Sequence, residues 1–227
     1  MLLPCRFLYL KLYVTLHINV PEIVQKLRIY FVNNNHHNKH TTMINLEKKK
    51  TFNLTKQAPG LNQVKIGLSW DPTGDGRSPD ADASVFMLNE SGKIPGERYF
   101  VFFNNLVSED GAVVHSGDNR TGAGDGDDEE VNINLASVSL SVVQIMLVIT
   151  IHNKSEGFHF GNVLNSSVRV YNKTSGDILC QYRLSESYDG CDSLIIGRFY
   201  RNGAEWEFEA MGQAFEGGLE ATVELYS

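Results

Sequence analysis

Short runs of Val, Ile, Phe, Tyr and Trp, separated by clusters of Gly, Asn, Asp and Ser, recur throughout the chain after residue 43. Runs of this length suit strands rather than helices, and the regular turn residues between them are typical of antiparallel sheets. In the last run, Glu alternates with Trp206 and Phe208, as in a strand with one face in solvent. The ten runs are "VKIGLSW", "ASVFML", "RYFVFF", "AVVHS", "EVNINL", "IMLVITI", "SVRVYN", "ILCQYRLS", "SLIIGRFY" and "EWEFEAMGQAF". They predict an all-β fold, a β-sandwich of two mainly antiparallel sheets, with one or two short helices near residues 136–143 and 219–226.

Residues 1–42 differ in composition from the rest of the chain. They are rich in Asn, His, Lys, Ile and Tyr, and they end in the low-complexity stretch "NNNHHNKHTT" before Met43. They lack the alternation and the turn residues that mark strands further along, so they offer no core of their own. We therefore expect residues 1–42 to be a poorly ordered N-terminal extension or a start-site artefact, and residues 43–227 to form one β-sandwich domain.

The charge of the chain is distributed unevenly. The formal net charge is -7, but residues 51–227 carry 12 Lys or Arg against 25 Asp or Glu. A domain this acidic repels nucleic-acid phosphates and anionic lipid. No stretch reaches the roughly 20 apolar residues of a membrane-spanning helix. We expect neither nucleic-acid binding nor a transmembrane segment.

The cysteines bear on the cellular compartment. Cys5, Cys180 and Cys191 are an odd number and form no C-x-x-C motif. This pattern suits a reducing compartment better than a disulfide framework, although a pair between Cys180 and Cys191 is the alternative. We expect a cytoplasmic protein.

The stretch "HSGDNRTGAGDGDDEEV", residues 115–131, holds six acidic side chains among several glycines. Calcium takes about six to eight oxygen ligands from flexible loops, and glycines allow backbone carbonyls to turn inward. The alternative is a solvated acidic turn without a ligand. The oxygen donors of this loop are Asp118, Asn119, Asp125, Asp127, Asp128, Glu129 and Glu130.

A second loop, "DPTGDGRSPDADAS", adds Asp71, Asp75, Asp80 and Asp82. Two acidic loops in one domain favour a metal, because gathered like charges destabilise a fold unless a cation offsets them. Nitrogen and sulfur ligands are absent from both loops, and the nearest imidazole, His115, lies in a strand-like run. Such donors favour calcium or magnesium over zinc or copper, and flexible glycine-rich loops favour calcium over magnesium. The sequence thus predicts Ca²⁺ as the bound ion.

Several long strings occur in a characteristic order. They include "DADASVFML", then "SGDNRTG" followed by "GDGDDE", and then "RFYRNGAEWEFEAMGQAF". Over residues 43–226 the chain resembles the TerD family of tellurium-resistance and stress proteins. The resemblance implies a β-sandwich that binds calcium through its acidic loops and has no established catalytic activity. It also implies a cytoplasmic protein that joins other tellurium-resistance proteins in membrane-associated complexes.

The resemblance carries over to individual positions. Asp80 and Asp82 stand in the family's Asp-x-Asp-Ala-Ser pattern, whereas Ala81 replaces a commonly larger apolar residue. Residues 1–42 have no counterpart and inherit no function. With Asp71 from the second loop, the predicted calcium ligands are Asp71, Asp80, Asp82, Asp118, Asn119, Asp125, Asp127, Asp128 and Glu129.

A metal-dependent hydrolase is the alternative function. The same carboxylates would hold one or two divalent ions that activate water beside a general base. The candidate bases, His115, His152 and His159, all fall at the edges of strand-like runs, where structural roles are more common. The sequence contains no G-x-S-x-G motif and no phosphate-cradling loop. We therefore predict a binding or scaffold module rather than an enzyme.

Overall fold

The computed structural model describes residues 44–45, 51–71, 79–117, 126–183 and 188–227. These residues belong to the unit Thr41–Ser227. The predicted N-terminal extension lies outside the described residues. No helix within the described ranges is long and apolar enough to cross a membrane.

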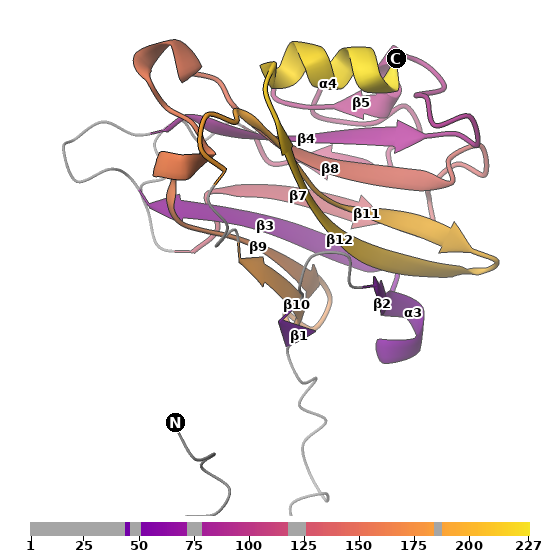
Figure 1. Cartoon of the computed structure of the whole chain (residues 1–227). Coiled ribbons are helices and arrows are strands. Elements are labelled where there is room, and N and C mark those ends of the chain that lie inside the picture. Colours follow the sequence, from indigo (N-terminus) through magenta and orange to yellow (C-terminus); the bar gives the residue numbers. More distant parts are fainter. Residues whose placement is uncertain (1–43, 46–50, 72–78, 118–125, 184–187) are drawn as a thin grey trace, which may run out of the picture. The chain divides into compact units, whose positions relative to one another are not determined.

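Twelve described strands form two six-stranded sheets (Figure 1). Neighbouring strands in these ranges run antiparallel, except that β1 pairs with β10 in parallel. In spatial order, sheet A contains β1 (Ile44–Asn45), β10 (Ile178–Arg183), β9 (Leu164–Asn172), β3 (Gln63–Asp71), β7 (Glu129–Asn134) and β6 (Val113–His115). Sheet B contains β2 (Thr51–Asn53), β12 (Glu205–Phe215), β11 (Ser193–Asn202), β8 (Gln144–Ile151), β4 (Ala81–Leu88) and β5 (Phe100–Val101). The predicted all-β fold of two mainly antiparallel sheets is confirmed.

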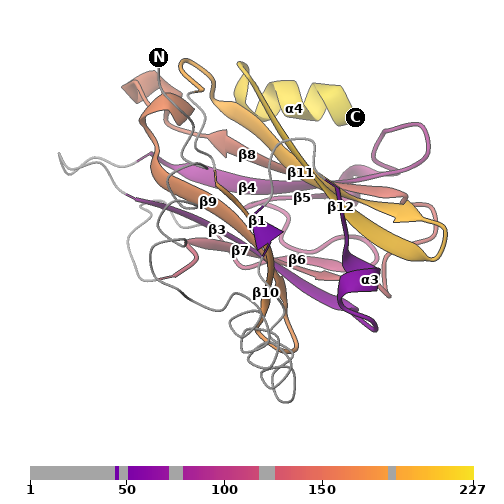
Figure 2. The same ribbon diagram turned by 60° about the horizontal axis from the view of Figure 1, so that its bottom comes forward.

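The core lies between the sheets because apolar residues alternate along the strands. In β12, Trp206, Phe208 and Ala210 are buried, whereas the intervening glutamates are partly exposed. In β3, the buried side chains of Val64, Ile66 and Leu68 face the same core. Side chains at odd and even positions of these strands thus lie on opposite faces of the sheet, as a period of two requires. Figure 2 shows the strands of sheet A from a second side.

The outer face of sheet B is also apolar, and a C-terminal helix covers it. Phe86, Leu88, Met146 and Ile195 form a second buried cluster with Tyr226 of α4. The helix α4 (Gly218–Tyr226) agrees with the prediction for residues 219–226. The other described helices are short: α3 (Leu54–Gln57), η1 (Glu97–Tyr99), η2 (Lys154–Glu156) and η3 (Phe160–Asn162).

The helix predicted near residues 136–143 was wrong. The segment forms turns between β7 and β8. Its serines bond locally: the Ser141 backbone N–H donates to Ser139 Oγ at 3.3 Å, and the two hydroxyl oxygens lie 2.9 Å apart. The Ser139 N–H donates to Asp110 Oδ2 at 2.8 Å. Serine side chains compete in this way with the backbone hydrogen bonds of a helix, and in this segment the turns form instead of the helix.

Candidate metal site

Two predicted ligands lie at the same end of sheet A. The strand β3 ends at Asp71, and Asp128 directly precedes the antiparallel neighbour β7. The Asp128 N–H donates to the Leu68 carbonyl at 2.7 Å, and Asp128 Oδ2 accepts the Trp70 N–H at 2.9 Å. Burial raises the pKa of Asp128, and the negative charges of Asp127 and Asp71 raise it further. The hydrogen bond from the Trp70 N–H acts in the opposite direction and lowers this pKa. Negative charge therefore accumulates at this end of the sheet.

Asp127, the preceding residue, lies on the outer face of sheet A. Its side chain is only 4% exposed. One carboxylate oxygen is 3.1 Å from Lys65 Nζ. The other is 3.0 Å from Arg169 Nη2 and accepts the Tyr171 hydroxyl at 3.2 Å. The carboxylate charge of Asp127 is thus compensated by two cations of the sheet.

The strand register explains this position. In the sheet, Lys65 is opposite Tyr171, and Gly67 is opposite Arg169. A Cβ atom at Gly67 would overlap the Asp127 carboxylate. The absent side chain therefore leaves the space in which Asp127 reaches its partners.

The network around Asp127 shifts the pKa values of its partners. Burial raises the pKa of Tyr171 to about 12, and its hydrogen bond to Asp127 acts in the same direction. Burial opposes the charged form of Lys65, but its bonds to Glu130 at 2.7 Å and to Asp127 outweigh burial and raise the pKa of Lys65. The ammonium also lies 4.3 Å from the centre of the Tyr171 ring. Lys65 thus stays protonated at neutral pH.

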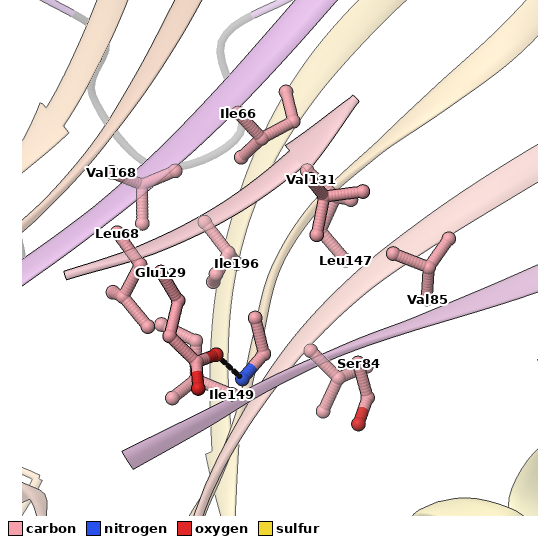
Figure 3. A pocket seen from close by; sticks show the side chains of 12 residues that line it. Ile66, Leu68, Ser84, Val85, Glu129, Val131, Leu147, Ile149, Val168 and Ile196 are labelled. Carbon is pink, nitrogen blue, oxygen red and sulfur yellow. Dashed lines mark hydrogen bonds between the residues drawn. The ribbon is translucent and has the colours of Figure 1, made fainter. Parts of the chain in front are cut away.

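Glu129 points between the sheets. Its side chain is 1% exposed, and Oε2 accepts the Ala83 N–H at 2.7 Å (Figure 3). The side chains around it belong to the core, and they include Leu68, Val131 and Ile149. The cavity between them measures about 10 Å³, which is no larger than one water molecule requires. Glu129 therefore joins β7 of one sheet to β4 of the other.

His115 completes this contact. Its Nε2 lies 3.0 Å from the Ala83 carbonyl oxygen and 3.6 Å from Glu129 Oε2. Its Nδ1 accepts the Gly117 N–H at 3.0 Å, which assigns the proton of the neutral ring to Nε2. Burial lowers the pKa of His115, but the hydrogen bond and charge of Glu129 outweigh it and raise the pKa. With both nitrogens engaged, His115 is poorly suited to bind a metal.

Asp80 and Asp82 lie at the start of β4, and both are buried. The Asp80 N–H donates to Asn153 Oδ1 at 2.9 Å, and its carbonyl accepts the His152 N–H at 2.8 Å. Asp82 lines a groove on the outer face of sheet B, beside Thr150 and Asp192. The Asp82 side chain therefore points into a different part of the molecule from the side chains of Asp127 and Glu129.

The structure thus brings Asp71 and Asp128 to one end of the sandwich, while Asp82, Asp127 and Glu129 face three other environments. Within the described ranges, no group of three or more His, Cys, Asp or Glu side chains could hold a metal ion. The remaining predicted ligands, Asp118, Asn119 and Asp125, lie outside the described residues. The predicted ligand set therefore stays a prediction.

Sequence reasoning missed the partners of Asp127. Lys65, Arg169 and Tyr171 lie at alternate positions of two strand-like runs, so their side chains share the outer face of sheet A. The alternation along each run shows that these side chains share one face of the sheet. Only the pairing of β3 with β9 brings them close to Asp127. The sequence also places Asp127 and Asp128 next to each other without any sign that their carboxylates face different environments.

Comparisons with known proteins agree over most of the chain. The TerD domain model matches residues 42–226. The chain is 40% identical over 185 residues to the tellurium resistance protein TerD of Serratia marcescens, covering 81% of this chain and 96% of that protein. It is 42% identical over 179 residues to general stress protein 16U of Bacillus subtilis, covering 78% and 93%.

A solved structure has a similar fold. It is that of a homologue of telluride resistance protein (TerD) from Streptomyces coelicolor, with a TM-score of 0.59 and 24% identity. The similarity covers 72% of this chain and 96% of that one. Sequence and fold point to the same conclusion, and the chain belongs to the TerD domain family.

Proposed function

We propose that this protein binds calcium through its acidic loops and acts in the stress response, including tellurite resistance, as a binding or scaffold module. The relatives named for tellurium resistance and general stress support the biological role. In this proposal the protein works in the cytoplasm and joins other tellurium-resistance proteins in a membrane-associated complex.

The observation that carries the calcium proposal is that Asp71 and Asp128, two carboxylates from the two acidic loops, lie at the same end of β3 and β7. A divalent cation between them would offset their like charges. The donors are oxygens, which calcium prefers, and the nearby His115 uses both of its nitrogens elsewhere. Asp71 and Asp128 would hold the ion together with Asp118, Asn119 and Asp125. The remaining predicted ligands are Asp80, Asp82, Asp127 and Glu129.

The hydrolase alternative gains no support from His115 or His159. A general base needs a free nitrogen that faces the water it activates. Both nitrogens of His115 are engaged, and His159 Nδ1 lies 3.1 Å from the Gly161 nitrogen and 3.3 Å from the Gly190 nitrogen, both of which donate to it. These contacts favour the binding module as the proposal.

Calcium titration with thermal unfolding tests the proposal. An ion that binds only the folded chain, at about a hundred times its dissociation constant, stabilises the fold by about 2.7 kcal/mol. For a domain of this size the melting temperature should rise by about 5 to 10 °C. Asp128→Asn should remove most of this rise. Magnesium should need at least about tenfold higher concentration, because it demands a stricter geometry.

Glu90→Gln is the matched control. Glu90 is exposed and follows β4 at the end opposite to Asp80 and Asp82. The variant removes one negative charge, as Asp128→Asn does, and should keep the full calcium-dependent rise. The calcium proposal fails if calcium leaves the melting temperature of the unmutated chain unchanged, or if both variants respond equally.

A further inference from the structure

A groove crosses the outer face of sheet B beside α4. Its volume is about 600 Å³, which lies within the usual range of about 300 to 1,000 Å³ for small-molecule sites. It is formed by the start of β4, the segment after β5, the end of β8 and the first turns of α4.

Aromatic rings form one wall of the groove. Phe100 stacks on the fully buried Phe86 with ring centres 4.3 Å apart and 15° between planes. Phe102 stacks on Phe100 at 4.3 Å and 7°, and Phe103 meets Phe102 edge-on at 5.1 Å. Phe100, Phe102 and Phe103 are partly exposed and line the groove. An aromatic stack therefore runs from the second apolar cluster to the groove.

Carboxylates predominate among the described charged residues of the groove. These are Asp82, Asp192, Glu220 and Lys154, so in the described part of the lining acidic groups exceed basic ones by two. Asp82 and Asp192 are 6% and 4% exposed. Lys154 Nζ already lies 3.0 Å from Asp192 Oδ2 and 3.3 Å from Glu216. This part of the lining therefore attracts a cation and repels an anion.

The start of α4 does not change this preference. A helix N-terminus favours anions because its first N–H groups have no partner in the helix. Here Asp192 Oδ1 accepts the N–H groups of Gly217 at 2.8 Å and Gly218 at 3.1 Å. The protein's own carboxylate thus occupies the position that a bound anion would take.

We propose that this groove binds a small organic cation, an ammonium or guanidinium group joined to an apolar body. Asp82 would pair with the charged group, while Phe102 and Phe103 would contact both the charge and the apolar body. The proposal does not rest on calcium binding.

Titration with three probes of nearly equal size tests the proposal on the full chain. The probes are phenethylamine, 2-phenylethanol and phenylacetate, which are cationic, neutral and anionic at pH 7. Phenethylamine should bind with a dissociation constant below about 1 mM, at least about tenfold more tightly than the alcohol, and phenylacetate should not bind measurably. Calorimetry is done with excess chelator, because Asp82 is also among the predicted calcium ligands.

Two variants locate the site, and one controls for charge. Asp82→Asn should weaken phenethylamine binding about tenfold, and Phe102→Leu should weaken it about threefold while keeping an apolar side chain. Glu90→Gln, which also removes one negative charge, should leave binding unchanged. Equal binding of amine and alcohol, or unchanged amine binding in Phe102→Leu, overturns the proposal. If Asp82→Asn does not fold, the probe series and Phe102→Leu still decide it, whatever the calcium titration shows.

Discussion

Asp127 and Asp192 are both almost fully buried, and each fastens a peripheral segment to the outer face of a sheet. Asp127 holds the end of the acidic loop on sheet A, and Asp192 holds the start of α4 beside sheet B. Their side chains are 4% and 5% exposed. The donors differ, since Asp127 depends on the side chains of Lys65, Arg169 and Tyr171, whereas Asp192 accepts two backbone N–H groups besides Lys154.

This difference affects how each contact responds to mutation. Backbone donors at a helix start are positioned by the chain itself, so substitutions nearby leave them in place. Side-chain donors must be ordered at an entropic cost and depend on the register of β3 and β9. The Asp127 contact should therefore be sensitive at several positions of sheet A. The Asp192 contact should be sensitive mainly to loss of its own charge.

The largest effect is expected for Asp127→Ala. Removing this carboxylate takes the counter-charge from the partly buried Arg169 and leaves Lys65 with Glu130 alone, which should lower the free energy of unfolding by about 2 to 3 kcal/mol. Urea unfolding measures the change, with Glu90→Ala as an exposed acidic control that should change stability by less than about 0.5 kcal/mol. Gly67→Ala should act in the same direction, because its methyl group displaces Asp127. A loss similar to that of the control would show that the network does not stabilise the fold.

Asp192→Asn should have an intermediate effect that depends on pH. Burial opposes ionisation, but the bonds from Lys154, Gly218 and Gly217 outweigh it and lower the pKa of Asp192 below its ordinary value of 3.8. A lowered pKa means that the contact stabilises the fold above about pH 3.8 and loses this contribution as the pH falls through the folded-state pKa. The variant should lose about 1 to 2 kcal/mol at pH 7. Urea unfolding between pH 7 and pH 3 should show this difference shrinking with acid, and a constant difference would contradict the assignment.

Tyr171→Phe should have the smallest effect of the three. It removes one hydroxyl donor at 3.2 Å from Asp127, while Lys65 and Arg169 remain. A loss of about 0.5 to 1 kcal/mol is expected from urea unfolding. In a double-mutant cycle with Asp127→Ala, the cost of Tyr171→Phe should nearly vanish. Additive losses would mean that the hydroxyl stabilises the fold by another route.

Much of the fold could be predicted from the sequence because alternation is a local property. All ten runs contain a described strand, although in "RYFVFF" the strand comprises only Phe100–Val101. The failures also had local causes that the pattern does not resolve. In residues 136–143, Ser139 and Ser141 form hydrogen bonds with each other, and the segment does not form a helix. The short helix α3 (Leu54–Gln57) begins where the Asn53 side chain accepts the Lys56 N–H, too briefly to produce a helical pattern.

The candidate site was less predictable because it depends on which strands become neighbours. The oxygen-rich composition of the loops is visible in the sequence, and so is their proximity to strand ends. The direction of each carboxylate is not. Asp127 and Asp128 are adjacent in sequence, yet one contacts three side chains of the sheet and the other accepts the Trp70 N–H. Asp82 faces the groove under α4 because of its place in the alternation of β4.

The contact of Glu129 and His115 with Ala83 has a further consequence for solubility. Within the described ranges, β5 pairs with β4 only at Val85 and Phe86, so no described strand covers this edge of β4 at Ala83. An uncovered edge exposes N–H and C=O groups to which a strand of another molecule can add, and this is a common first step of aggregation. Here Glu129 Oε2 accepts the Ala83 N–H, and His115 Nε2–H donates to the Ala83 carbonyl oxygen. The two side chains therefore stand where an intruding strand would bind, and they protect the sandwich from growing at this edge.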